Sequence, residues 1–126
     1  MEFPHTLVFY NADETPALAV SVARASRLPQ RMRGLLFHPA PPEGCGLLIE
    51  RCPSVHTFGM RYAIDVVFFD RERRVTRVRA NVKPNRPFVG GGWNAASALE
   101  TRSGWLPVER LRAGMRADVD LSQTPR

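Results

Sequence analysis

The run Ile64–Phe69, with the sequence IDVVFF, constrains the fold more than any other part of the chain. Apart from Asp65, each of its residues is apolar, so an extended segment would present apolar side chains on both faces. Such a strand is typical of a sheet covered on both sides. We therefore expect a central strand here. Because burying an unpaired charge is costly, we also expect an arginine or backbone N–H groups to hold the Asp65 carboxylate.

The rest of the chain alternates short strand patterns with turn sequences rich in glycine and proline. We expect further strands over residues 6–11, 18–22, 46–50, 55–58, 75–82, 97–101 and 115–121. A short helix is predicted from the N-cap Ser26 to Gly34, and one or two helical turns over 106–111. Gly90–Gly92 is predicted to be a flexible connection. There are too few helices for a doubly wound fold, so we predict an α+β, predominantly β domain: a curved antiparallel or mixed sheet closing toward a barrel, with two short helices.

The length of 126 residues suits one domain spanning residues 1–126. No apolar run approaches the roughly 20 residues of a membrane span, and the amino terminus lacks the pattern of a secretory signal, so we expect a cytoplasmic protein. In that compartment Cys45 and Cys52 are expected to be free thiols or ligands, with a short-loop disulfide between them as the alternative. The net charge of +6 comes almost wholly from arginine. Two interpretations stay open, arginine forks for anionic partners or a GC-rich coding genome.

Three motifs carry a family resemblance: RMRGLL at 31–36, GLL at 46–48 and HTFGMRYAIDVVFFD at 56–70. From about residue 18 to 121, including Leu99-Glu100 and the segment 113–115, the chain resembles the family called domain of unknown function 192. The resemblance implies a compact β-rich domain of bacteria and archaea with no established activity. Some relatives are exported or occur beside genes for pilus assembly and secretion. Leu36 stands where the family often has methionine, and Arg73 stands at the usual glycine of a hairpin. Because the amino terminus lacks the pattern of an export signal, we do not expect this chain to be exported.

A binding site needs only a few convergent polar groups beside apolar side chains. The predicted ligand-binding residues are Arg33, His56, Met60, Arg61 and Asp65, at the open end of the sheet near Phe58 and Trp93. The expected ligand is a small anion or a protein partner, and no cofactor is expected. The alternative is a buried polar network in which Asp65 pairs with an arginine to hold loops. We therefore predict a non-enzymatic accessory module, and the resemblance implies a link to pilus or secretion systems.

Two enzymatic hypotheses use the same stretch. Cys45, Cys52, His56 and Asp65 are ligand types that zinc accepts, but separations of seven, four and nine positions do not resemble the paired cysteines of structural zinc sites. We therefore assign no metal residues. Alternatively, Cys52 would act as a hydrolytic nucleophile, with His56 as base and Asp65 orienting the ring. That arrangement requires the thiol and the imidazole to lie within hydrogen-bond distance.

Nucleic-acid binding is a further alternative, based on a basic hairpin. Its cations are Arg71, Arg73, Arg74, Arg77, Arg79, Lys83 and Arg86. Such a row could follow phosphates. Aromatic residues are not interleaved with it, so a solvated strand edge protected by charge is the favoured interpretation.

Overall fold

The computed structural model describes residues 1–120, and Leu121 of the predicted last strand lies outside them, as do residues 122–126. The strands are β1 (His5–Tyr10), β2 (Pro16–Ala25), β3 (Cys45–Ile49), β4 (Ser54–Val55), β5 (Ile64–Phe69), β6 (Val75–Val82), β7 (Val89–Gly90), β8 (Ser97–Arg102) and β9 (Ala117–Asp120). Helix α1 spans Leu28–Arg33, and the 3-10 helix η1 spans Val108–Arg110. The domain is therefore mostly β, as predicted.

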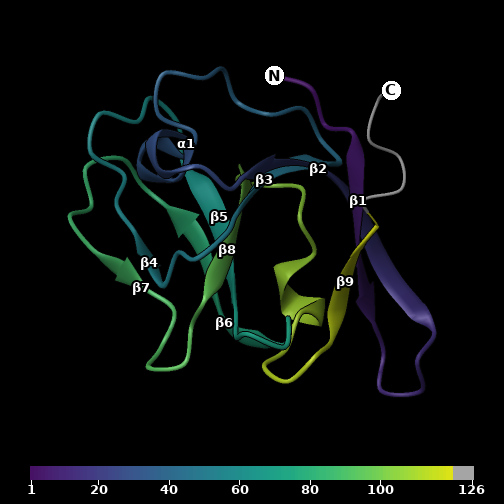
Figure 1. The fold of residues 1–126 in the computed structure, drawn as a ribbon. Coiled ribbons are helices and arrows are strands. Elements are labelled where there is room, and N and C mark those ends of the chain that lie inside the picture. The colour runs from purple at the N-terminus through teal and green to yellow at the C-terminus, as the bar shows by residue number, and fades with distance from the viewer. Residues whose placement is uncertain (121–126) are drawn as a thin grey trace.

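Seven strands form one mixed sheet in the order β6-β5-β8-β3-β2-β1-β9, and β4 and β7 form a small second sheet (Figure 1). β2 pairs with β3 in parallel, whereas the other neighbours in the main sheet are antiparallel. All six residues of β5 are buried between the edge strand β6 and the inner strand β8. The prediction of a strand covered on both faces is confirmed.

The main sheet is not closed into a barrel, which corrects the sequence-based expectation. β6 and β9 are its two edges, and they meet only where both strands begin. There, Arg74 and Arg116 form an isolated bridge, and the Val75 N–H donates to the Met115 carbonyl at 2.8 Å. Because this bridge is antiparallel and precedes both strands, β6 and β9 run away from it in opposite directions, and no ladder forms between them.

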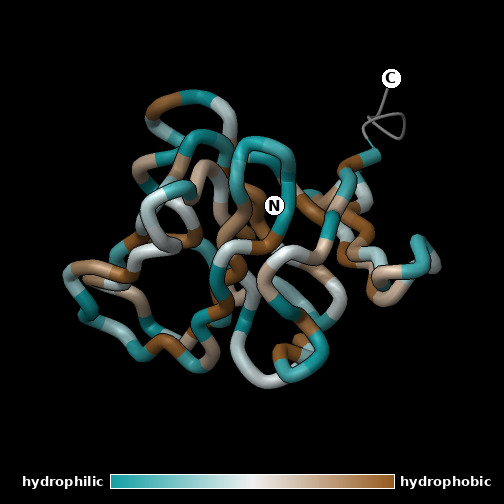
Figure 2. Tube along the Cα trace, turned by 90° about the horizontal axis from the view of Figure 1, so that it is seen from below, coloured by the Kyte–Doolittle hydropathy of each residue, from teal (hydrophilic) through white to brown (hydrophobic). Residues whose placement is uncertain are grey.

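Hydrophobic residues fill both faces of the sheet. Val67 and Phe69 of β5 belong to one core, together with side chains from β1, β2 and the η1 region. Ile64, Val66 and Phe68 belong to the other core, which also includes side chains beside α1, β4 and β7. Figure 2 shows hydrophobic segments in the strands at the middle of the molecule and hydrophilic colour on several peripheral loops. Because side chains alternate along a strand, each apolar residue of β5 belongs to one core or the other.

Two local elements differ from the sequence-based expectation. The N-cap of α1 is Arg27 rather than Ser26, and its N–H donates to Gln30 Oε1 at 3.3 Å. The strand expected over 55–58 is reduced to Ser54–Val55, which pairs with Val89–Gly90 where we expected a flexible connection. The side chain of Thr57 explains the early end. Its hydroxyl donates to the Lys83 carbonyl and accepts from the Arg86 N–H, so the chain turns there.

Candidate functional site

Helix α1 is held against the end of β3 by arginine side chains. Arg31 donates from Nε to the Glu50 carbonyl at 2.9 Å and from Nη2 to the Arg51 carbonyl at 2.8 Å. Arg51 donates in turn to the Ser26 carbonyl at 3.0 Å. The apolar residues Leu28 and Met32, whose spacing predicts the helix, are 59% and 70% exposed. Their side chains therefore face solvent rather than the core.

A cavity of about 280 Å³ lies between α1 and the segment 51–56, and we call it the α1 cavity. Two apolar residues of the helix line its mouth, and Glu100 of β8 is its buried acidic residue. Its lining includes Leu28, Met32, Arg33, Cys52, His56 and Glu100. Arg31 and Arg51 line it as well, so the cavity combines an apolar wall, three arginines and a buried carboxyl group.

Glu100 is buried at 4% exposure on the α1 side of the sheet. Register places it opposite Leu47 and Val66, both in the core on that side. Its Oε1 accepts the Leu35 N–H at 3.2 Å. Burial raises the pKa of this carboxyl to about 7, and the Leu35 hydrogen bond opposes the rise. When protonated, such a group both donates and accepts hydrogen bonds. A carboxyl group in a cavity whose pKa is far from its ordinary value marks a candidate functional site.

Two weaker acids lie near this carboxyl. Burial, followed by the charge of Glu100, raises the pKa of the Cys52 thiol to about 11. The same two causes raise the pKa of Tyr62 to about 12. The Cys52 Sγ donates to the Ser54 carbonyl at 3.1 Å, and the Tyr62 hydroxyl donates to the His38 carbonyl at 3.3 Å. Both groups are therefore protonated at neutral pH.

The structure divides the predicted site residues between cavities. Arg33 and His56 both line the α1 cavity, where His56 is exposed and its ring lies 5.9 Å from that of Phe58. Met60 and Arg61 line a separate cavity of about 460 Å³. Arg33 is exposed, and within residues 1–120 its side chain makes no hydrogen bond or ion pair. It is therefore available to a ligand.

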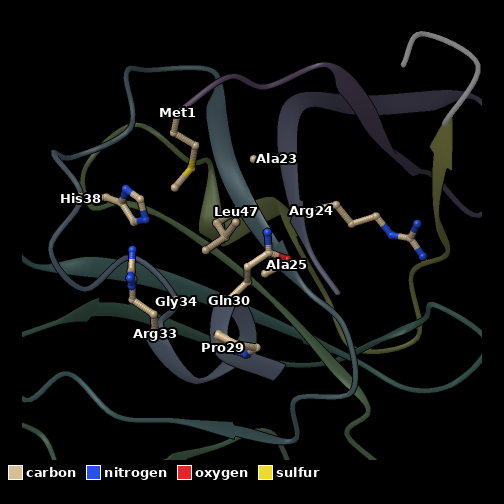
Figure 3. Close-up of a pocket in the computed structure, with 10 residues that line it drawn as sticks. All are labelled: Met1, Ala23, Arg24, Ala25, Pro29, Gln30, Arg33, Gly34, His38 and Leu47. Carbon is tan, nitrogen blue, oxygen red and sulfur yellow. The ribbon is translucent and has the colours of Figure 1, made fainter. Parts of the chain in front are cut away.

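A further cavity of about 310 Å³ lies beside the end of α1 and shares Arg33 and Gly34 with the α1 cavity. Figure 3 shows the side chains of Arg33 and His38 pointing toward one another in it. Burial, followed by the charge of Arg33, lowers the pKa of His38. Arg33 thus stands between two hollows.

Asp65 does not join the α1 cavity. It pairs with Thr101 across β5 and β8, on the face opposite Glu100. Its Oδ1 accepts the Asn81 N–H at 2.7 Å and the Ser103 hydroxyl at 3.3 Å, where β6 has an irregular register. The expectation of a backbone N–H partner is confirmed, and Asp65 thus holds the irregular part of β6.

We expect Asp65→Ala to lower the free energy of unfolding by about 2 kcal/mol, because it leaves the Asn81 N–H without its acceptor. Urea unfolding measures this loss. Asp118→Ala is the control, since Asp118 is exposed and its ion pair with Arg116 is long at 3.9 Å. It should change stability by less than about 0.5 kcal/mol. Equal effects of the two substitutions would contradict the structural role of Asp65.

The residues of the metal hypothesis do not converge in the part of the chain that the structure describes. No three histidine, cysteine or acidic residues within 1–120 form a group able to hold a metal ion. Cys45 and Cys52 are both free, so the alternative disulfide is not formed here. Cys52 donates to Ser54, and thus not to His56 as the hydrolase hypothesis requires.

Comparison with known families decides the classification. The sequence matches the family DUF192, described as Uncharacterized ACR, over residues 9–119. The chain belongs to this family. None of the curated proteins matches it.

Two solved structures share the DUF192 chain's fold. A protein of unknown function from Novosphingobium aromaticivorans DSM 12444 has a TM-score of 0.77 at 16% identity, with 90% of this chain and 83% of that chain covered. A putative transcription regulator from Sinorhizobium meliloti 1021 has a TM-score of 0.78 at 16% identity, with 94% and 96% covered. At that identity, the likeness concerns the fold alone. Among residues 1–120 of the DUF192 chain, no helix is long and apolar enough to cross a membrane.

Sequence reasoning did not select Glu100 as a site residue of this DUF192 domain. Two signals were present: a carboxylate inside the predicted strand 97–101, and the dipeptide Leu99-Glu100 in the family resemblance. A charged residue within a buried strand is unusual, and it needs either a partner or a function. Its position at the α1 cavity depends on α1 and residues 51–56, which lie far from it in the sequence.

Proposed function

We propose that this protein is a non-enzymatic binding module whose α1 cavity accepts a small anionic ligand. The observation that carries the proposal is the burial of Glu100 in a cavity that is also lined by Arg33, an exposed arginine whose side chain makes no hydrogen bond or ion pair within the described residues. The accessory role, a protein partner, a link to pilus or secretion systems and the cytoplasmic location belong to the same proposal and rest on the sequence and the resemblance.

The cavity offers three kinds of contact to such a ligand. Arg33 presents a guanidinium group that binds carboxylate or phosphate through charge-assisted hydrogen bonds. Leu28 and Met32 offer an exposed apolar wall for the body of the ligand. Glu100 offers a hydrogen-bonding group to the polar end that enters deepest. The preferred ligand therefore has an anionic group at one end and a polar, uncharged group at the other.

Several observations favour binding over Cys52 hydrolysis. A thiol whose pKa is raised to about 11 is a poor nucleophile at neutral pH, because the thiolate is the reactive form. Asp65 lies on the opposite face of the sheet and makes its hydrogen bonds with Asn81 and Ser103. It is therefore not placed to orient His56.

The test is an NMR titration of the labelled protein with small carboxylates, phosphates and sulfonates. We expect amide shifts at Leu35, Cys52 and His56. Arg33→Gln should weaken binding about ten-fold, because it removes a charge-assisted contact.

Arg112→Gln is the matched control, because it removes one exposed arginine between η1 and β9. It should leave the affinity unchanged within about two-fold. Shifts elsewhere, no shifts with any compound, or equal losses in the two variants would contradict the proposal.

A further inference from the structure

Four cations of the predicted basic hairpin line an open groove of about 540 Å³ along β6, which we call the basic groove. They are Arg77, Arg79, Lys83 and Arg86, and all four are exposed. Within residues 1–120, none of these side chains makes a hydrogen bond or an ion pair. By contrast, Arg73 of the same hairpin is paired with Glu50 at 2.9 Å. The basic groove therefore carries positive charge that the domain does not neutralise.

The fold places one exposed aromatic side chain in this groove and a second in another hollow along β6. Phe88 lines it and is 73% exposed. Trp93 is 97% exposed and lines a separate hollow at the turn before β6, together with Arg71 and the acidic residues Asp70 and Glu72. The Thr76 hydroxyl donates to the Gly91 carbonyl at 2.8 Å, so the loop carrying both rings runs along β6. The structure thus supplies aromatic residues that the linear sequence of the hairpin lacks.

The loop that carries these rings is held in place by packing and hydrogen bonds. The Gly91 N–H donates to the Pro53 carbonyl at 3.1 Å, and β7 pairs with β4. Gly91 packs so closely on the Phe68 ring that an added Cβ would overlap it. The Phe88 ring lies against Gly90, where an added Cβ would be 2.8 Å from its Cζ. A ring carried by a loop that is held in this way loses less conformational freedom on binding than a ring on a mobile loop.

We propose that the basic groove binds single-stranded nucleic acid. Unneutralised arginine and lysine side chains follow a phosphate backbone without reading its sequence. Exposed aromatic rings stack on bases, and this requires bases that are not already stacked inside a duplex. The pairing of four cations with Phe88 and Trp93 therefore favours a single strand over duplex nucleic acid and over an anion without bases. This inference rests on β6 and the 86–96 loop and is independent of the α1 cavity.

Fluorescence anisotropy of labelled oligonucleotides of about 12 nucleotides tests this inference. At about 50 mM salt, we expect the single strand to bind more tightly than the duplex, with affinity falling steeply as salt rises. The double variant Arg77→Gln/Arg79→Gln should bind about ten-fold more weakly. Arg110→Gln/Arg112→Gln removes two exposed arginines elsewhere and should change affinity by less than about two-fold.

Heparin fragments separate nucleic-acid binding from general attraction to polyanions. Phe88→Ala/Trp93→Ala should weaken single-strand binding about ten-fold and leave heparin affinity unchanged, because heparin has no bases to stack. Both rings are exposed, so thermal unfolding should show an intact fold. The inference is overturned if the wild-type protein does not bind the single strand, if both arginine pairs lose affinity equally, or if loss of the rings leaves single-strand binding unchanged.

Discussion

Glu100→Gln is expected to stabilise the protein at about pH 8 by up to about 3 kcal/mol and to change little at about pH 4. The pKa of Glu100 is about 7 in the folded protein, against an ordinary value of 4.5. The folded state therefore holds this proton more tightly than the unfolded state. Its contribution to stability is fully present below pH 4.5, falls as pH rises and is lost above about pH 7. Glutamine stays neutral and still accepts the Leu35 N–H.

Urea unfolding at several pH values measures this effect. The difference between wild type and Glu100→Gln should grow between about pH 4.5 and pH 7 and then become constant. Glu109→Gln is the control, since Glu109 is exposed. It should follow the wild-type pH dependence. A Glu100→Gln variant with unchanged pH dependence, or one less stable than wild type at pH 8, would contradict the assignment of Glu100 as a buried acid.

Gly34→Ala is expected to lower the free energy of unfolding by about 3 kcal/mol. Gly34 has φ +56 and ψ −132, a conformation that side chains with a Cβ rarely adopt. An added Cβ would also lie 2.8 Å from Glu100 Oε1, which accepts the adjacent Leu35 N–H. Backbone strain and displacement of the Glu100 carboxyl therefore act together, and the substitution should also weaken ligand binding in the α1 cavity.

Gly44→Ala is the matched control for Gly34→Ala. Gly44 also has a positive φ of 84, but an added Cβ would meet nothing within 4 Å. It should therefore cost only the backbone strain, about 1 kcal/mol, and leave binding intact. Equal losses of stability in the two variants would show that the close approach of Gly34 to Glu100 is not important.

The strands were predictable where the sequence pattern records burial directly. Ile64–Phe69 is buried along its whole length, and the alternation in Val75–Val82 reproduces β6. Closure into a barrel was not predictable. It depends on how far β6 and β9 pair, and the apolar pattern of each strand contains no information about its partner. The small sheet also escaped prediction, because β4 and β7 have two residues each.

The candidate site was predictable only in part. Arg33 and His56 were selected from two separate motifs, at 31–36 and 56–70, and do line one cavity. Asp65 was grouped with them because all were expected at the open end of the sheet, but alternation along β5 places it on the face opposite Glu100. Glu100 lies on β8, late in the chain. It comes close to α1 because β8 is the neighbour of β3, and α1 lies at the end of β3. Local pattern therefore identifies candidate residues, whereas the face of the sheet decides which of them meet.

The most direct test of the proposed site is a carbon-13 NMR titration of the Glu100 side-chain carboxyl in the wild-type protein. The central claim is that a buried carboxyl in the α1 cavity holds its proton near neutral pH. We expect the Glu100 carboxyl to titrate with a midpoint near pH 7, and we expect that midpoint to shift when an anionic ligand binds. A midpoint near the ordinary value of 4.5 would mean that Glu100 is solvated or paired. It would contradict the claim that Glu100 is a buried acid in the α1 cavity.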